Sequence, residues 1–366
     1  MTTIGIEERA AIREGFARLL SEKASEADLR RTMASDSGHD TDLWKAISDM
    51  GIAGLLVDPD HGGVGGSILD VETIMEEAGA ALLAAPLLSG GVMAVALLAE
   101  SSDADLKARL LPAIASGETI ATVAVTGDNG LWTRDDIGVV ATAGWLSGTA
   151  SYVLSANIAD VLLVVAIAGD GVAVFEVDSK AGGVTIEPLQ AWDPTLRLSR
   201  IRFDKVAAKV LAGVDSSSVE RTLDLARVAL AGEQAGAARR IFDITVEYLR
   251  TRVQFGRPIG GFQALKHMAA DLLVEVESAT SAARAAAQAL AKGTPDAAAL
   301  VSLAAFACAD AFHQVAAAAI QMHGGIAFTW EHPAHLYLRR ARVDAQLFGA
   351  SAYHRDRYVS ALETAA

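Results

Sequence analysis

Residues 250–263, R-T-R-V-Q-F-G-R-P-I-G-G-F-Q, place several side chains that could bind a ligand in one short connection between two helical patterns. Arg252 offers a planar fork of donors that matches phosphate oxygens. Gln254 and Gln263 offer amide donors and acceptors, and Phe255 offers a flat aromatic surface. The stretch therefore predicts either the capping of two helix ends or a site that grips a planar, phosphorylated ligand.

A second junction of this kind follows the next long helical pattern. Gln321 lies near the end of that pattern, and Gly324 and Gly325 come directly after His323. Paired glycines let a backbone approach a ligand closely because they have no Cβ atom. We interpret His323 as a residue that shapes this turn.

Metal and thiol chemistry are not predicted. His332 and His335 lie close together, but no third ligand follows at a spacing typical of zinc sites. His332 is better interpreted as an anchor for the last helix. Cys308 is the only cysteine and lies within an apolar helical pattern. We interpret it as a small core residue of a protein from a reducing compartment.

Length and composition exclude several classes of protein. The chain has 366 residues, 52% of them hydrophobic, and a net charge of −14 with no basic stripe for nucleic acid. Mean hydropathy is +0.31, yet no run of about 18 apolar residues predicts a membrane span. The N-terminal residues M-T-T-I-G-I-E-E-R-A have no apolar core of a secretory signal. We therefore expect a cytoplasmic globular protein with two or three structural units.

The spacing of apolar residues divides the chain into helical, β and helical regions. Helical spacing in the first third is interrupted by a Gly-rich loop at 54–66. Val, Ile and Thr dominate residues 119–207 between frequent turn signals, which predicts a small antiparallel β domain with a hairpin at 168–171.

Four long helical patterns then complete the chain, with Gly and Pro between them, and predict a four-helix bundle. We expect an α+β protein with an N-terminal α domain, a middle β domain and a C-terminal four-helix domain. The four patterns lie at 219–250, 262–292, 295–323 and 333–362, and the expected domains are 1–117, 118–212 and 213–366.

These motifs, taken in this order, resemble the acyl-CoA dehydrogenases over essentially the whole chain. The resemblance rests on R-T-R-V-Q-F-G-R-P-I-G-G-F-Q-A-L-K-H-M-A-A-D at 250–271 and Q-M-H-G-G-I-A-F-T-W-E-H-P at 321–333. V-D-P-D-H-G-G-V-G-G at 57–66 and I-R-F-D-K-V-A-A-K-V-L-A-G at 201–213 add to it. It implies FAD as cofactor, an acyl-CoA substrate, an electron-transfer flavoprotein as acceptor and a tetramer built as a dimer of dimers.

In this family each flavin lies at a dimer interface, and one subunit grips the pyrophosphate and adenine end of its neighbour's FAD. The alternative for the matching residues is plain helix capping by Arg252 and Gln263, with Phe255 in the core. The resemblance implies that the grip consists of Arg252, Gln254, Phe255, Gln263, Gln321, Gly324 and Gly325.

The half of the site that holds the flavin ring is eroded. The family's loop reads V-T-E-P-G-A-G-S-D, whereas this chain has the shorter V-T-G-D-N-G-L at 125–131. Thr126 is retained there. The flavin-stacking run W-I-[ST] corresponds to Tyr152-Val153-Leu154, so an aromatic residue is kept and the hydroxyl is lost at Leu154.

The catalytic carboxylate is missing from both positions that the family uses, which hold Phe348 and Ala226 here. Neither side chain can accept the α-proton of a thioester. Glu233 shares a helix face with Ala226 but lies about 10 Å further along the axis, so it is either a displaced base or a buried polar residue. Asp344 is a weaker candidate that we expect to be a solvated partner of Arg340.

Three hypotheses follow. The chain resembles the subunit without the catalytic Glu in actinobacterial heteromeric, steroid-type acyl-CoA dehydrogenases, whose partner supplies the base in an α2β2 assembly. Alternatively, it is a homotetrameric dehydrogenase that uses Glu233, or a non-catalytic binding protein on the same fold. The sequence does not specify the acyl chain.

Overall fold

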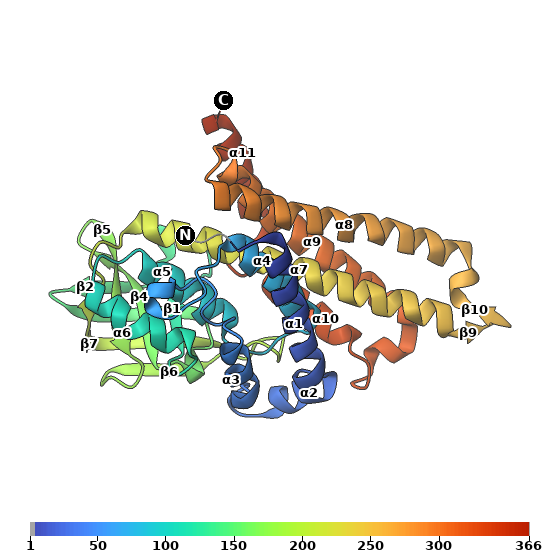
Figure 1. The fold of residues 1–366 in the computed structure, drawn as a ribbon, viewed down its shortest axis with the longest axis horizontal. Helices are drawn as coiled ribbons and strands as arrows, with labels where there is room; N and C mark the ends of the chain where they lie inside the picture. The colour runs from blue at the N-terminus through green and yellow to red at the C-terminus, as the bar shows by residue number, and fades with distance from the viewer. Residues whose placement is uncertain (1–3, 366) are drawn as a thin grey trace.

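The computed structural model describes residues 4–365, which fold as a helical region, a β-sheet and a second helical region (Figure 1). Capping side chains define several of the N-terminal helices, because Ser25, Asp40 and Asp103 each accept a backbone N–H of the first turn. The elements of this region are α1 (Ile6–Lys23), α2 (Glu26–Ala34), α3 (Thr41–Asp49), α4 (Ile68–Ala80), the π-helix η2 (Leu87–Ala94), α5 (Val95–Ala99) and α6 (Ala104–Ala115).

The middle region is one eight-stranded sheet with the order β6-β7-β3-β2-β4-β5-β8, in which β1 also pairs with β4. The predicted antiparallel β domain is confirmed for five of the strand pairings, whereas β1 and β2 both run parallel to β4. The predicted hairpin is confirmed, since Ala168 of β4 pairs with Gly171 of β5. The strands are β1 (Ala121–Ala124), β2 (Val139–Thr142), β3 (Trp145–Leu154), β4 (Val161–Ala168), β5 (Gly171–Asp178), β6 (Val184–Pro188), β7 (Leu198–Ala207) and β8 (Lys209–Val210).

The C-terminal region contains five helices, so the prediction of four was wrong in one respect. The last pattern is interrupted at 345–350, where Phe348 and Gly349 have φ values of 59° and 121°. An α-helix cannot contain these conformations. The helices are α7 (Ser216–Thr251), α8 (Gln263–Lys292), α9 (Ala297–His323), α10 (Ala334–Asp344) and α11 (Ser351–Ala365).

Helix α9 is the central helix of this region. By length and composition alone, the segment Ala297–Phe328 is apolar enough to cross a membrane. In the fold, however, α9 packs against α7, α8, α10 and α11. Its apolar surface therefore serves as the core of the C-terminal region.

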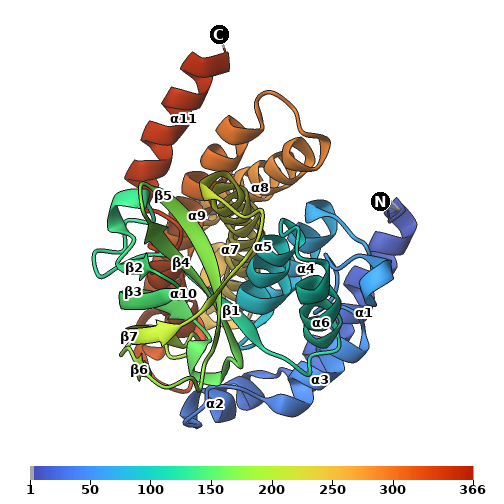
Figure 2. The same ribbon diagram turned by 90° about the vertical axis from the view of Figure 1, so that its left-hand side faces the viewer.

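Helix α7 joins the regions because it packs on α4 at backbone distance. A Cβ atom on Gly236 would lie 1.8 Å from the carbonyl oxygen of Glu76, and one on Gly79 would lie 1.8 Å from that of Glu233. Glycine is therefore required at both positions. Figure 2 shows the strands and the N-terminal helices side by side, with α7 behind both.

Candidate functional site

The two predicted ligand-binding junctions lie at one end of the C-terminal region (Figure 1). The ring of Tyr248 stacks on that of His323 with centroids 4.6 Å apart, and the His323 ring is 4.4 Å from that of His332. Tyr248 lies one turn before Arg252, and His323 directly precedes Gly324. This aromatic stack therefore brings the end of α7 next to the end of α9.

The polar side chains at this end are exposed and form no side-chain hydrogen bonds with the described residues. Arg252, Gln254, Gln263 and Gln321 are all exposed. Among the described residues, none of these four side chains makes a hydrogen bond, and Arg252 closes α7 only through its backbone N–H. Phe255 is 89% exposed. The alternative of helix capping around a core phenylalanine is therefore not what the structure shows.

Phe255 also has a strained backbone. It occupies the turn between β9 (Val253–Gln254) and β10 (Arg257–Pro258), where its φ is 53° and that of Gly256 is 75°. Two positive φ values are typical of a tight hairpin turn, but a bulky residue at the first position is uncommon. A strained aromatic side chain that is held out to solvent indicates a functional role.

The backbone conformation requires glycine at Gly324, whereas the fold does not require it at Gly325. Gly324 has φ 66° and ψ −142°, a conformation that essentially only glycine adopts. A Cβ atom on Gly325 would meet nothing within 4 Å. The fold of the chain therefore does not require Gly325, and the open space beside it suits a ligand that approaches the backbone.

The loop at 125–138, which is predicted to face the flavin ring, is held by hydrogen bonds among its own residues. The Thr126 hydroxyl donates to Asp136 Oδ2 at 2.7 Å and accepts the backbone N–H of Trp132 at 3.3 Å. The Asp136 carboxylate also accepts from the Asn129 amide at 2.8 Å and the Leu131 N–H at 2.9 Å. Burial raises the pKa of Asp136, but these hydrogen bonds outweigh that effect and the pKa is lowered. Thr126 thus helps to fold the loop.

An aromatic pair fills the position at which the resemblance predicts the family's carboxylate. Phe348 is fully buried, and the Trp132 ring packs edge-on against it with centroids 4.9 Å apart. The Trp132 indole N–H donates to the carbonyl oxygen of Gln346 at 3.2 Å, and Arg227 Nε donates to that of Phe348 at 3.3 Å. Ala226, the second position, is also fully buried. The sequence pattern did not single out Trp132 or Arg227.

Tyr152, the other residue predicted to face the flavin ring, is covered by the same loop. Its hydroxyl donates to the carbonyl oxygen of Asp128 at 3.1 Å. A Cβ atom on Gly130 would lie 3.1 Å from its ring. Arg200 Nε and the Ser151 hydroxyl both donate to Asp128 Oδ1, at 3.0 and 2.6 Å. The side chains of Thr126 and Tyr152 are thus both engaged within the protein.

Glu233 belongs to a buried charge network where all three regions meet. It pairs with Arg340, which also donates to Asp193 at 2.7 Å and to Thr195 at 3.1 Å. Both members of the Glu233–Arg340 pair are buried. Burial raises the pKa of Glu233, while the Arg340 charge opposes that effect. This geometry matches the interpretation of Glu233 as a buried polar residue.

Asp344 is not the solvated partner of Arg340 that we expected. Its side chain is 1% exposed, and neither carboxylate oxygen has a hydrogen-bond partner within residues 4–365. Burial, followed by the nearby Glu233 charge, raises its pKa well above the ordinary value. The sequence pattern of α10 did not predict the burial of Asp344, because that burial depends on the packing of α10 against α7 in the fold.

The remaining candidates are structural. No group of three or more His, Cys, Asp or Glu among the described residues could hold a metal ion. His332 Nδ1 accepts the backbone N–H of Ala334 at 3.2 Å and so anchors the start of α10. Cys308 is fully buried, its thiol donates to the carbonyl oxygen of Ala279 at 3.3 Å, and burial raises its pKa.

Two segments of the chain match models of one protein family. Residues 6–118 match the family Acyl-CoA dehydrogenase, N-terminal domain, and residues 216–362 match Acyl-CoA dehydrogenase, C-terminal domain. The chain is 36% identical over 343 residues to acyl-CoA dehydrogenase IpdE2 of Mycobacterium tuberculosis, covering 93% of both proteins. It is 37% identical over 357 residues to FadE34 of the same organism, which covers 94% of this chain but 46% of FadE34.

Solved structures agree. The ChsE4-ChsE5 complex from Mycobacterium tuberculosis gives a TM-score of 0.91 at 26% identity, over 98% of both chains. A variant of the steroid ACAD Tcur3481-Tcur3483 gives 0.88 at 28% identity, also over 98% of both chains. The chain therefore belongs to the acyl-CoA dehydrogenases, the FAD-dependent oxidoreductases that act on acyl-CoA thioesters.

Proposed function

We propose that this chain is one subunit of a heteromeric α2β2 acyl-CoA dehydrogenase, whose homologous partner supplies the catalytic base and the pocket for the flavin ring. One contrast carries the proposal. The end of α7 and α9 presents unpaired polar side chains, whereas the ring side is filled by Trp132 and Phe348. A chain built in this way can complete a neighbour's FAD site and has no carboxylate at either usual position in its own.

FAD fits the exposed end of this chain. Arg252 would pair with the pyrophosphate, Gln254, Gln263 and Gln321 would donate and accept at the polar edges of the nucleotide, and Phe255 would cover an apolar face. Gly324 and Gly325 would let the backbone approach it. Bound FAD supplies the acceptor for the hydride that leaves Cβ of the thioester. The ring side does not fit, because Thr126 and Tyr152 are engaged elsewhere and Phe348 occupies the space.

Two features of the relatives support a second subunit. Both similar complexes carry two protein names, ChsE4-ChsE5 and Tcur3481-Tcur3483. FadE34 aligns with this chain over only 46% of its length, which leaves room in that polypeptide for a second unit of similar size. The similarity to the steroid ACAD Tcur3481-Tcur3483 favours a bulky, steroid-type acyl-CoA as substrate class in lipid or steroid degradation. An electron-transfer flavoprotein is the proposed acceptor, and the cytoplasm is the proposed location.

The flavin grip can be tested in the assembled enzyme. Co-production of the Arg252→Gln chain with its homologous partner should give an assembly of unchanged mass that has lost most of its flavin absorbance. Arg250→Gln, an exposed arginine at the end of α7, is the matched control and should retain flavin. Full flavin retention by Arg252→Gln would contradict the assignment of the grip.

The alternative homotetrameric enzyme requires Glu233 to act as base. The buried ion pair with Arg340 argues against it, because a paired, enclosed carboxylate is poorly placed to receive a substrate proton. Turnover per bound flavin in Glu233→Gln decides between the two. Unchanged turnover removes the alternative, and loss of turnover with flavin retained supports it. A non-catalytic binding protein would hold no flavin in any assembly.

A further inference from the structure

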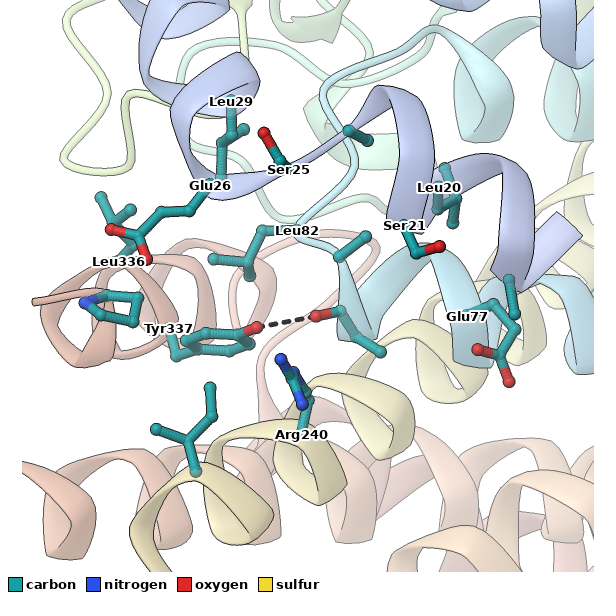
Figure 3. Close-up of a pocket in the computed structure, with 16 residues that line it drawn as sticks. Leu20, Ser21, Ser25, Glu26, Leu29, Glu77, Leu82, Arg240, Leu336 and Tyr337 are labelled. Atoms are coloured by element: carbon teal, nitrogen blue, oxygen red, sulfur yellow. Dashed lines mark hydrogen bonds between the residues drawn. The ribbon is translucent and has the colours of Figure 1, made fainter. Parts of the chain in front are cut away.

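We propose that this chain has a second ligand site, away from the flavin grip, that binds a small amphipathic carboxylate. The site is a cavity of about 490 Å³ between α1, α2, α4, α7 and α10 (Figure 3). None of its lining residues belongs to the grip or to the ring side, so the inference goes beyond the function proposed above.

The cavity has the size and the walls of a small-molecule site. Sites for such ligands typically measure about 300–1,000 Å³ and are lined mainly by apolar side chains. Apolar walls come from both helical regions, with Leu20 on α1, Leu29 on α2, Leu82 after α4, Ile244 on α7 and Leu336 on α10. These walls suit an apolar body such as an alkyl chain or a fused ring.

Arg240 gives the cavity a cation without a counter-ion. Arg240 is exposed on α7 and forms no ion pair with a carboxylate among the described residues; the partner of its guanidinium is the Tyr337 hydroxyl. The two acids of the lining have other partners, since Glu77 pairs with Arg13 at 2.6 Å and Glu26 pairs with Arg30 at 2.7 Å. A ligand carboxylate is the group that this arrangement recognises, because the arginine fork matches its two oxygens.

Tyr337 fixes where the carboxylate would lie. Its hydroxyl donates to the carbonyl oxygen of Ala80 at 2.7 Å, and Figure 3 shows Arg240 rising from α7 toward that pair. Burial raises the pKa of Tyr337 to about 12, so the phenol stays neutral and does not compete as an anion. The carboxylate would meet Arg240 beside this hydroxyl, with the apolar body against Leu82 and Leu336.

A second hollow continues from the cavity on the charged side. It measures about 310 Å³ and shares Glu77, Ala80 and Arg240 with the cavity. Its other charged lining residues are of both signs: Arg13, Arg239, Arg284, Glu76, Asp243 and Glu277. Arg240 therefore stands between an apolar chamber and a polar one. This position is typical of a residue that holds the polar end of an amphipathic ligand.

Binding to the full-length chain, alone and in its assembly, tests the site. Decanoate and cholate are the probes, because they separate a straight chain from a fused ring system, and 1-decanol is the uncharged control. Wild-type chain should bind at least one carboxylate more tightly than decanol, and Arg240→Gln should weaken that binding about tenfold. Arg239→Gln, which removes the neighbouring arginine that pairs with Glu277, should bind like wild type.

A substitution that fills the cavity provides an independent test. Ala17→Phe on α1 places a ring among the lining residues and should abolish carboxylate binding while flavin content stays unchanged. Equal binding by wild type and Arg240→Gln, binding that survives Ala17→Phe, or no binding of either probe would each overturn the inference. Because the measurement needs no flavin, its failure is distinguishable from failure of the heteromer proposal.

Discussion

The end of α7 and α9 and the loop at 125–138 correspond to the two halves of the proposed flavin site, and their polar side chains differ in whether they are hydrogen-bonded within the protein. Arg252 and Gln263 are exposed and make no side-chain hydrogen bond with any described residue. Thr126 and Tyr152 are both hydrogen-bonded inside the protein. Most buried polar groups in proteins are hydrogen-bonded, so the difference separates side chains that serve the fold from those left for a ligand.

Backbone strain shows the same contrast. Phe255, Trp132, Tyr152 and Phe348 all have φ values between 53° and 59°. At Trp132 and Phe348 close aromatic packing in the core holds the strained conformation, whereas Phe255 is 89% exposed and meets the Phe262 ring only edge-on, with centroids 5.9 Å apart. Strain that packing compensates can persist as part of the core, and strain without such compensation indicates a partner outside the chain.

The largest effect is expected at the charge network that makes Glu233 structural. Arg340→Met leaves Glu233 and Asp193 buried without their cation and should lower the free energy of unfolding by roughly 3–5 kcal/mol. Glu233→Gln should cost less, because Arg340 keeps Asp193 and Thr195. Urea unfolding measures both. A change below about 1 kcal/mol for Arg340→Met would show that the network is dispensable.

The aromatic pair should be part of the core. Trp132→Ala removes a ring that is 5% exposed and should destabilise the chain by roughly 3–5 kcal/mol. Trp192→Ala is the matched control, since that ring is 53% exposed and its loss should cost about 1 kcal/mol or less. Equal decreases in melting temperature for Trp132→Ala and Trp192→Ala would contradict the assignment of Trp132 to the core.

Glu72 should make stability fall with rising pH. This carboxyl on α4 is 2% exposed, and burial, followed by the nearby Glu76 charge, raises its pKa to about 8. The folded state then binds more protons than the unfolded state between pH 4.5 and 8, so its contribution to stability is lost across that window. The free energy of unfolding of the wild-type chain should fall by on the order of 3 kcal/mol from pH 5 to pH 8, and Glu72→Gln should abolish this decrease. Chemical unfolding of both proteins at pH 5 and pH 8 checks this, and identical profiles would contradict it.

The smallest effect on stability is expected at the exposed end. Phe255→Gly relieves the positive φ and removes no buried contact, so the free energy of unfolding should change by no more than about 1 kcal/mol. Flavin retention by the assembled enzyme should nevertheless fall. Trp132→Ala and Phe255→Gly should therefore have opposite effects, because the Trp132 ring stabilises the fold and the Phe255 ring contacts the ligand. An assembly that keeps its full flavin would refute this role.

Much of the fold could be predicted because it depends on local signals. Period changes separate helices from strands, and Gly and Pro mark the ends of α7, α8 and α9. The domain boundaries at 118 and 213 stay a prediction; they lie after the end of α6 and before the start of α7. The parallel pairing of β1 with β4 could not be predicted, since it joins segments 40 residues apart in sequence. The break before α11 depends on the strained Phe348, which no periodicity shows.

The absence of a base at Phe348 and Ala226 could be predicted from residue type alone. The contacts around these positions could not, because they depend on tertiary packing. Phe348 and Ala226 cannot act as bases in any fold, so their sequence identity was sufficient. That Trp132 would lie on Phe348, or that Asp344 would be buried without a partner, depends on how α10 and the loop meet the rest of the chain. Such long-range contacts are not encoded in the spacing of a single element.

The most direct test of the central claim is the amount of flavin per chain, measured with assembly mass, for this protein alone and co-produced with its homologous partner. The heteromer proposal predicts no tightly bound flavin and no acyl-CoA oxidation for the chain alone, and about half a flavin per chain in an α2β2 assembly with the partner. One flavin per chain in a homotetramer that oxidises acyl-CoA would contradict it.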